Sequence, residues 1–398
     1  MKIAGVIAEY NPFHNGHQYQ LSRMRSCGAE RIVAVMSGNF VQRGDVAIQD
    51  KFRRARTAVL CGADLVVELP TVFSMAPAER FAYGGIFLLE ALGCVDTLSF
   101  GCEDDDITAL RRLADCLDDP ETEKQIAECV RSGISHPAAR ERAVRALLGD
   151  ADADRLRRPN NILGIEYIRA CRRIGAEFNF LPIRRTGVAH DSTARTGRFM
   201  SASEIRRILC SGGPLPDDCL PAAACEMIQS GLQDGTVPAR FSRLELPLLY
   251  ALRRTDPAAL ALLPDISEGL EVKIYRSAQQ ATNLEDLLAG IKSKRYPLAR
   301  IRRLLLYALL GFRCEDFSKK PPFIRVLAAN QNGFDILRTA QKTACLPVVT
   351  KAADVHKLGP DAEQFFKLES RCDDIYALAA PKTRPGAANY TTGIQIVK

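Results

Sequence analysis

The sequence predicts an α/β fold in which a Rossmann-like parallel sheet is followed by a mainly α-helical, basic C-terminal domain. In the first half of the chain, short apolar runs alternate with segments of helical periodicity; beyond residue 216 the helical pattern continues alone to about residue 311, and a mixed tail follows. The length of 398 residues suits two or three domains. The Gly- and Pro-rich segment from Ser211 to Pro216 separates them, which gives predicted domains of residues 1–215 and 216–398.

Five apolar runs predict the strands of the sheet. Each run is short and uninterrupted, as in strands that helices cover on both faces. Because helices separate them, the strands are expected to be parallel and joined by right-handed crossovers. The glycine-rich dinucleotide fingerprint is absent. The predicted strands are Ile3 to Ala8, Arg31 to Met36, Leu65 to Leu69, Thr97 to Phe100 and Phe178 to Ile183.

Helical periodicity fills the segments between these runs. A glycine follows each of the first three predicted helices and can end it. Residues 104–175 are also mostly helical in pattern. A further helix is predicted from Glu204 to Cys210, with Ser203 as its N-cap. The first three helices are His17 to Cys27, Asp50 to Cys61 and Pro77 to Leu92, and their glycines are Gly28, Gly62 and Gly93.

Composition narrows the class of protein. The chain is 47% hydrophobic and 25% charged, as in ordinary globular proteins, and its net charge of +7 is compatible with a nucleic-acid partner. The 13 cysteines include no C-x-x-C pair, so neither a protein-bound metal nor a disulfide framework is expected. The N-terminal apolar run is too short for a signal peptide, and no run is long enough to span a membrane. A cytoplasmic protein is therefore expected.

The strongest functional signal is an H-x-G-H motif within Glu9-Tyr10-Asn11-Pro12-Phe13-His14-Asn15-Gly16-His17. It lies between a predicted strand and a predicted helix, where an open α/β sheet binds ligands and helix amides favour phosphate. Both histidines could donate hydrogen bonds to phosphate oxygens, and Gly16 would let a base or ribose approach the backbone. The alternative is a turn with two incidental histidines, although the whole chain has only five.

This strand, motif and helix resemble the signature of the nucleotidylyltransferase superfamily, whose members transfer an adenylyl or cytidylyl group and release pyrophosphate. The resemblance implies that His14 and His17 are catalytic and stabilise charge on the transferred phosphate. It also implies a Ser/Thr-rich turn that opens a helix near the end of the fold, and Met200 to Arg206 offers one. Ser201, Ser203 and Arg206 could contact the β- and γ-phosphates, while plain helix capping is the alternative reading.

Further stretches resemble the bacterial tRNA(Met) cytidine acetate ligase family over most of the chain. The family pattern usually has Thr where this sequence has Pro297, and a small residue where it has Cys102. The stretches are Met36 to Gly44, Asp64 to Pro70, Phe100 to Glu103, Asn160 to Tyr167, Ser267 to Gly269 and Lys294 to Arg303.

The resemblance implies a reaction in two steps. ATP and acetate would form acetyl-adenylate and pyrophosphate, and the acetyl group would then pass to N4 of the wobble cytidine of elongator tRNA(Met). Mg²⁺ is expected to accompany ATP. No obligate protein partner is expected.

The family's ATP contacts can be carried over residue by residue. Ser37-Gly38-Asn39, Gln42, Arg43 and Lys51 are weaker candidates that could meet acetate or the α-phosphate, with a structural loop as an equal alternative. The ATP contacts that the resemblance implies are Ile7, Ala8, Glu9, Tyr10, Asn11, Pro12, Phe13, His14, Asn15, Gly16, His17, Gln18, Tyr19, Gln20, Gly101, Asn160, Asn161, Arg184 and Arg185, besides the serines and arginine named above.

A basic cluster in the second domain predicts an RNA-binding surface. Phosphates attract such clusters, and an aromatic ring can stack on an unpaired base. The alternative is a solvated helix face. The cluster consists of Lys292, Lys294, Arg295, Tyr296, Arg300, Arg302 and Arg303.

Two other functions stay open at this point. A nucleotidylyltransferase that makes a nucleotide cofactor would share the motif but would not need a large basic helical domain. An ATP-binding RNA adaptor without turnover would share both features. Pyrophosphate release and its dependence on acetate distinguish these two functions from the acetate ligase.

Overall fold

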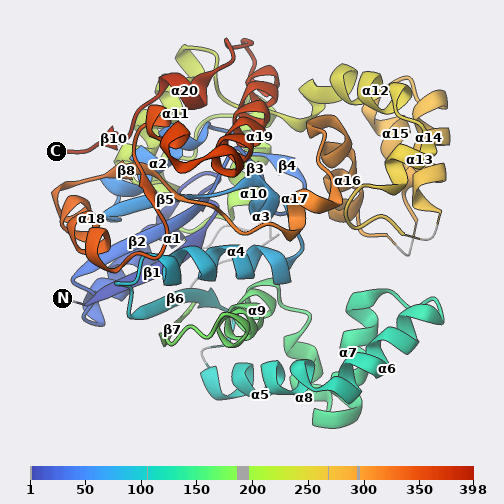
Figure 1. The fold of residues 1–398 in the computed structure, drawn as a ribbon, viewed down its shortest axis with the longest axis horizontal. Helices are drawn as coiled ribbons and strands as arrows, with labels where there is room; N and C mark the ends of the chain where they lie inside the picture. Colours follow the sequence, from blue (N-terminus) through green and yellow to red (C-terminus); the bar gives the residue numbers. More distant parts are fainter. Residues whose placement is uncertain (1, 105, 186–196, 268, 294–295) are drawn as a thin grey trace.

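The computed structural model describes residues 2–104, 106–185, 197–267, 269–293 and 296–398. Within them, an eight-stranded sheet has the order β10-β8-β5-β2-β1-β6-β7, and β9 pairs with β8 beside it (Figure 1). A separate two-stranded hairpin, β3–β4, follows β2. The strands are β1 Ile3–Ala8, β2 Arg31–Ser37, β3 Phe40–Val41, β4 Asp45–Val46, β5 Leu65–Leu69, β6 Thr97–Cys102, β7 Asn179–Arg184, β8 Ile324–Ala329, β9 Val348–Val349 and β10 Gln395–Ile396.

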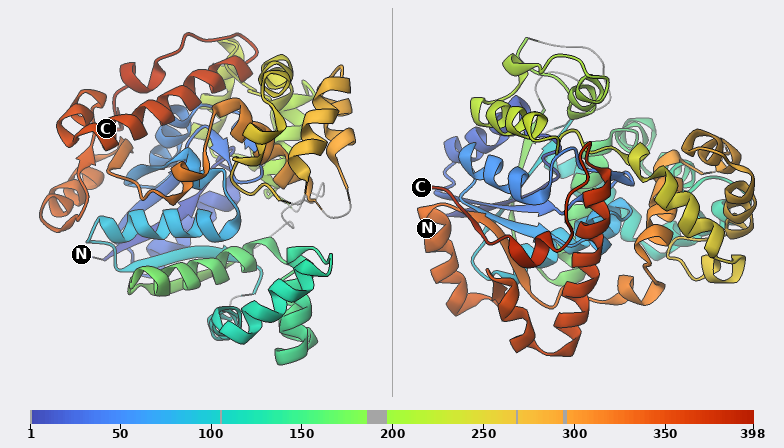
Figure 2. Two further views of the ribbon diagram at one scale, coloured as in Figure 1. Left: turned by 45° about the vertical axis from the view of Figure 1, so that its right-hand side comes forward. Right: turned by 90° about the horizontal axis from the view of Figure 1, so that it is seen from above.

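The predicted Rossmann-like sheet is confirmed. All five predicted strands are present, and each lies parallel to its neighbours within the order β5-β2-β1-β6-β7. Helices cover both faces, so side chains of one strand alternate between two cores. Ile3 and Ile7 of β1 join the core under α4, while Ala4 and Val6 join the core under α1 and α2. Figure 2 shows the sheet between its two helical layers.

The three predicted helices before β6 are confirmed as α1 Asn15–Ser26, α2 Lys51–Leu60 and α4 Ala78–Ala91, and α3 Thr71–Ser74 precedes α4. Gly28, Gly62 and Gly93 each have a positive φ just beyond a helix end, as a helix stop requires. The predicted N-cap at Ser203 is wrong. Helix α10, Ala202–Cys210, starts earlier, and the Ser201 hydroxyl accepts the capping hydrogen bond from Glu204 N–H at 3.1 Å.

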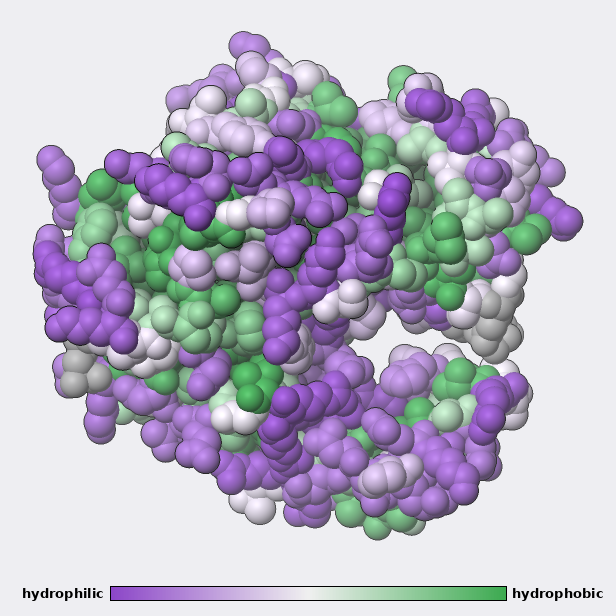
Figure 3. Space-filling model, in the orientation of Figure 1, coloured by the Kyte–Doolittle hydropathy of each residue, from purple (hydrophilic) through white to green (hydrophobic). Residues whose placement is uncertain are grey.

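Two helical lobes extend from the same side of the sheet (Figure 1). Figure 3 shows an open notch between them. The first lobe contains α5 Ile107–Asp118, α6 Pro120–Arg131, α7 His136–Leu148 and α8 Asp150–Arg155, and α9 Pro159–Ile174 leads back to the sheet. The second contains α12 Glu245–Arg254, α13 Pro257–Ala261, α14 Leu270–Gln280, α15 Leu284–Ile291 and α16 Leu298–Leu310.

The end of the chain returns to the sheet, so the predicted boundary at residue 216 does not separate two continuous domains. Strand β8 pairs antiparallel with β5, and β10 pairs with β8. Among the described residues beyond 216, the helices α12–α16 stand apart from the sheet as one lobe (Figure 1). The other helices beyond residue 216 are α11 Ala222–Gln233, α17 Cys314–Ser318, α18 Gln331–Thr343, α19 Pro360–Tyr376 and α20 Ala388–Thr391.

No helix in the described ranges combines the length and the apolar character needed to cross a membrane.

Candidate active site

A cavity of about 290 Å³ lies at the carboxyl ends of β1 and β6. Strand β1 has β2 on one side and β6 on the other, so the order of the parallel strands reverses here. Open α/β sheets bind ligands at such a reversal. Ile7, Ala8 and Glu9 line the cavity from the end of β1, and Phe100 and Gly101 line it from β6.

The two motif histidines form the start of α1 and line this cavity. The Nδ1 atom of His14 accepts a hydrogen bond from Gly16 N–H at 3.0 Å, and Nδ1 of His17 accepts one from His14 N–H at 3.2 Å. A neutral imidazole that accepts at Nδ1 carries its proton on Nε2. The helix start therefore fixes both rings in the tautomer that can donate a hydrogen bond from Nε2.

Gly16 has a structural role beside the close ligand approach predicted for it, which stays a prediction. It does not line the cavity. A Cβ atom at this position would lie 2.8 Å from Cε1 and 3.0 Å from Nδ1 of His14. The glycine is therefore needed because the His14 ring folds back over the helix start.

Helix α10 is joined directly to the motif loop. The Arg206 guanidinium donates a hydrogen bond to the Asn11 carbonyl at 2.6 Å, and both residues line the cavity. The side chain of Asn11 accepts from Ile48 N–H at 2.9 Å. The loop is thus held from two sides, and a cation is fixed beside the histidines.

Two further polar residues come from the ends of α9 and β7. Asn160 donates to the Glu103 carboxylate at 2.6 Å and accepts from Arg185 at 3.2 Å. Burial lowers the pKa of Arg185, while the nearby Glu103 raises it. Both Asn160 and Arg185 line the cavity, which places a second cation across from the histidine loop.

The predicted ATP contacts divide into two groups. Twelve line the cavity: Ile7, Ala8, Glu9, Tyr10, Asn11, His14, His17, Gln20, Gly101, Asn160, Arg185 and Arg206. The others lie in the same segments without lining it: Pro12, Phe13, Asn15, Gly16, Gln18, Tyr19, Asn161, Arg184, Ser201 and Ser203. Asn161 instead accepts from Glu103 N–H and donates to Asp104, which ties α9 to the loop after β6.

Residues 1–390 match the family model described as HIGH Nucleotidyl Transferase. The tRNA(Met) cytidine acetate ligase of Thermoanaerobacter sp. (strain X514) is 38% identical over 386 residues, which cover 95% of this chain and 96% of that protein. The chain belongs to the tRNA(Met) cytidine acetate ligase family. The protein of the same name from Acetivibrio thermocellus is 34% identical and aligns over the full length of both chains.

Solved structures of this ligase family agree with the fold. Thermotoga maritima TmcAL in its apo form has a TM-score of 0.95 with 33% identity, and the match covers 100% of both chains. The same protein bound with alpha-thio ATP has a TM-score of 0.93 over the same coverage. The α/β architecture and its arrangement of lobes are thus those of a ligase of this family.

Some residues that line the cavity could not be identified from the sequence. Asp45 was not among the candidates, and Gln42 and Arg43 were only weak ones; all three line the cavity from the β3–β4 hairpin. The hairpin has two-residue strands, too short for a periodic signal. The remaining unforeseen lining residues are Val41, Phe81, Phe100, Leu163, Tyr167, Ala202 and Arg302.

Asn39 and Lys51 lie outside this cavity. The Lys51 ammonium group is fully buried and lies 2.6 Å from a Glu68 oxygen and 2.7 Å from an Asp373 oxygen. Burial alone would lower the pKa of Lys51, but the two carboxylates raise it. Asn39 donates to Asp373 and accepts from Lys51 N–H. These residues bind α19 to the sheet, which is the structural alternative left open by the sequence.

Most described members of the predicted RNA-binding cluster make contacts within the chain. Arg300 donates to the Asp265 carbonyl at 2.7 Å, and Arg303 donates to the Gln42 carbonyl at 3.3 Å. Arg302 lines the cavity at the ends of β1 and β6, and Tyr296 is buried. Lys292 is exposed. Lys294 and Arg295 lie outside the described residues.

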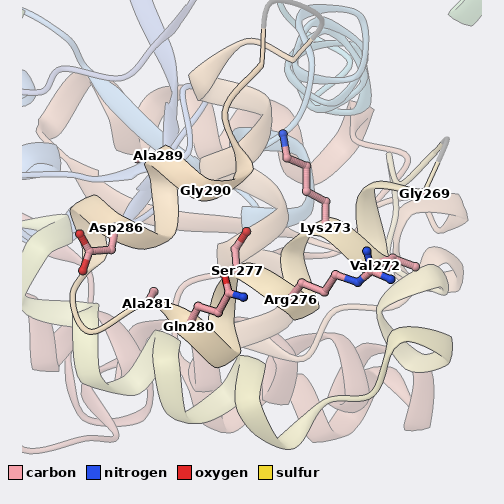
Figure 4. Close-up of a pocket in the computed structure, with 10 residues that line it drawn as sticks. All are labelled: Gly269, Val272, Lys273, Arg276, Ser277, Gln280, Ala281, Asp286, Ala289 and Gly290. Atoms are coloured by element: carbon pink, nitrogen blue, oxygen red, sulfur yellow. The ribbon is translucent and has the colours of Figure 1, made fainter.

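A larger cavity, of about 580 Å³, lies in the helical lobe between α14 and α15. Figure 4 shows Lys273 and Arg276 on α14, with Asp286 of α15 at the other end. The Lys273 ammonium donates to the Lys292 carbonyl at 3.3 Å. Arg276 and Lys292 are exposed, so this part of the lobe presents cations to solvent.

Proposed function

We propose that this chain is a tRNA(Met) cytidine acetate ligase. It activates acetate with ATP and transfers the acetyl group to N4 of the wobble cytidine of elongator tRNA(Met), which gives N4-acetylcytidine. The observation that carries the proposal is the geometry of His14 and His17, whose Nδ1 atoms both accept backbone hydrogen bonds. The names of relatives that match nearly the whole chain support the substrates.

In the first step, an acetate oxygen attacks the α-phosphorus of ATP. A new P–O bond forms to acetate, and the bond to the β-phosphate oxygen breaks, so pyrophosphate leaves with the electron pair. Negative charge grows on the oxygens around the α-phosphorus. The Nε2–H groups of His14 and His17 stabilise that charge, because fixed donors act most strongly where charge develops.

The phosphate tail lies among the cations of the cavity. Arg185 and Arg206 bind its oxygens, since a guanidinium matches phosphate geometry with two donors. Ser201 and Ser203 at the start of α10 are proposed to hold the terminal phosphates. Mg²⁺ would accompany ATP and would supply further positive charge at the phosphates beside Arg185 and Arg206. The apolar side chains of Phe81 and Leu163 receive the adenine or the acetyl methyl group.

The helical lobe is proposed to bind tRNA, with residues 1–215 contributing the adenylation site. The exposed side chains of Lys292 and Arg276 supply the basic surface, together with the predicted cluster residues Lys294 and Arg295, which follow Lys292 closely in the sequence. We propose that the nucleic acid enters through the notch between the two lobes (Figure 3). The reaction is placed in the cytoplasm, where tRNA and ATP occur together.

The test is nucleoside mass spectrometry of tRNA after incubation with the protein, ATP and acetate. N4-acetylcytidine should appear in elongator tRNA(Met) only when both small substrates are present. Labelled pyrophosphate should exchange into ATP without tRNA, and only with acetate and Mg²⁺. Exchange with another acid instead of acetate would overturn the acetate assignment. Absence of any exchange would support an ATP-binding RNA adaptor.

A further inference from the structure

The β3–β4 hairpin forms one wall of the cavity, and none of the predicted ATP contacts lies on that wall. Those contacts come from β1, α1, β6, α9, β7 and α10. The hairpin contributes Gln42, Arg43 and Asp45. Arg302 of the helical lobe lines the same cavity, and its guanidinium nitrogen lies 3.4 Å from the Asp45 carboxylate. This wall is therefore the side of the cavity that the proposed tRNA-binding lobe reaches.

We propose that Asp45 binds the N4 amine of the target cytidine and takes up the proton that this amine loses on acetylation. The inference rests on the proposed function and adds to it the group that handles the nucleophile. A carboxylate is the acceptor that proteins use for the N4–H₂ donor of cytosine. Asp45 has such a carboxylate in the cavity that holds the activating histidines.

The surroundings of Asp45 suit a proton acceptor. One carboxylate oxygen accepts from Val46 N–H at 2.8 Å, the other faces Arg302, and 33% of the side-chain surface stays exposed. Burial raises the pKa of Asp45, Arg302 and then Arg206 lower it, and Glu9 raises it. Arg43 of the hairpin and both motif histidines also line the cavity. A carboxylate with a raised pKa is a stronger base than an exposed one.

Glu9 is the other carboxylate among the described residues that line this cavity, and it has a different task. Its Oε1 atom accepts a hydrogen bond from Gln42 N–H at 2.9 Å. Glu9 therefore anchors the hairpin to the end of β1. Asp45 is the better placed acceptor for an amine that enters from the lobe side, because its carboxylate lies 3.4 Å from Arg302 of that lobe.

The hairpin and the helical lobe are in close backbone contact. A Cβ atom at Gly44 would lie 2.5 Å from the backbone nitrogen of Arg303 and 2.8 Å from Cβ of Arg302. Arg303 also donates to the Gln42 carbonyl at 3.3 Å. Because the turn rests directly on α16, the position of Asp45 is tied to the lobe that is proposed to deliver the RNA.

The transfer step balances with Asp45 as the base. The N4 nitrogen attacks the acetyl carbonyl carbon of acetyl-adenylate, and a C–N bond forms. The C–O bond to the phosphate breaks, and its electron pair leaves with AMP. The N4 proton passes to the Asp45 carboxylate and then to water. The N4 lone pair is delocalised into the ring, so the attack gains from a base that removes the proton as the bond forms.

The test is Asp45→Asn, with each step measured separately. Acetate-dependent pyrophosphate exchange without tRNA should fall far less than transfer does. Single-turnover transfer from preformed acetyl-adenylate to tRNA should fall by about 100-fold or more, the usual contribution of a general base. The parental transfer rate should rise with pH as the carboxylate ionises, and the variant should lack that rise. Asp45→Glu keeps a carboxylate and should recover part of the rate.

Asp265→Asn is the matched control. Asp265 also pairs with arginines of α16, at 3.2 Å from Arg300 and 3.6 Å from Arg303, but it does not line the cavity. Transfer should persist in this variant. Equal loss of transfer in both Asn variants, unchanged transfer in Asp45→Asn, or joint loss of exchange and transfer there would overturn the proposal. A parent protein that exchanges pyrophosphate but acetylates no tRNA would instead overturn the proposed function.

Discussion

The imidazole rings of His14 and His17 are stacked, with centroids 3.8 Å apart and planes inclined by 26°. Each ring accepts a backbone hydrogen bond at Nδ1, so the pair is oriented by the same turn that starts α1. The two rings therefore form one unit. A change to either ring, or to the turn beneath them, is expected to disturb both.

His17→Ala should reduce acetate-dependent pyrophosphate exchange by about two orders of magnitude or more, the usual cost of deleting one transition-state donor. The variant also loses the acceptor for His14 N–H, so unfolding stability should fall by about 1 kcal/mol. His17→Asn can keep an acceptor near Nδ1 but has no Nε2–H. It should lose activity as Ala does while regaining stability in thermal unfolding. A folded His17→Ala protein with normal exchange would remove His17 from the catalytic residues.

Gly16→Ala should lower pyrophosphate exchange strongly with little loss of stability. Alanine favours helix, but its Cβ would press on the His14 ring. Gly393→Ala is the control, because a Cβ there has no neighbour within 4 Å. Pyrophosphate exchange rates and thermal unfolding midpoints are to be measured for both variants. Normal exchange in Gly16→Ala would mean that the His14 ring can shift without cost.

Arg276→Ala combined with Lys292→Ala should weaken tRNA binding without affecting adenylation. Both side chains are exposed, and each lost phosphate contact should flatten the salt dependence of binding by about one. Filter binding at several salt concentrations measures this slope. An unchanged affinity for tRNA and an unchanged salt dependence would show that the RNA-binding surface lies elsewhere.

Arg303→Ala should behave differently from that pair. Its side chain is 11% exposed and contacts Asp265 and the Gln42 carbonyl. We expect a lower midpoint of thermal unfolding and slower adenylation, because the hairpin loses its support from α16. An effect on tRNA binding alone, with normal stability and exchange, would show that Arg303 acts as a plain phosphate contact.

The buried cluster around Glu369 should make stability depend on pH. Burial and then Glu68 raise the pKa of Glu369 to about 8, although Thr71 and Lys51 lower it. The folded state therefore binds more protons than the unfolded state between the ordinary pKa of Glu, about 4.3, and 8. Stability should fall as pH rises through that window. Glu369→Gln should remove part of this loss of stability. The midpoint of thermal unfolding should then drop less between pH 5 and pH 8 than in the parent protein. An unchanged drop would show that Glu369 is not the group responsible.

The sheet could be predicted because its central strands are short, apolar and separated by helices, and because the H-x-G-H motif marks where the first strand ends. The stretch Ile7 to Gln20 around the motif contains eight of the 22 residues that line the cavity. The rest depends on contacts between distant parts of the chain. Lys51 looked available to a ligand because its partner Asp373 lies more than 300 residues away in sequence. Arg302 looked like an RNA contact because no local pattern reveals its pairing with Asp45.

The late strands were missed for a related reason. The run Ile324 to Ala329 is apolar except for Arg325, but it follows a long helical stretch, and the two later strands, β9 and β10, have only two residues each, too few for a periodic signal. The cap at Ser201 was placed two residues late because both serines satisfy the same local rule. Side-chain chemistry near a motif was thus more predictable than element ends and long-range pairing.

The antiparallel strand β8 covers the β5 edge of the sheet, and β10 covers β8. During synthesis, residues 1–215 leave the ribosome long before residues 324–396 are made. Until then, β5 presents unpaired amides and carbonyls, which invite pairing with another chain. A nascent or truncated chain should therefore aggregate, or need a chaperone, even though it already holds the whole H-x-G-H motif. The β5 edge of the catalytic sheet is therefore covered only by a segment that is translated more than 250 residues later.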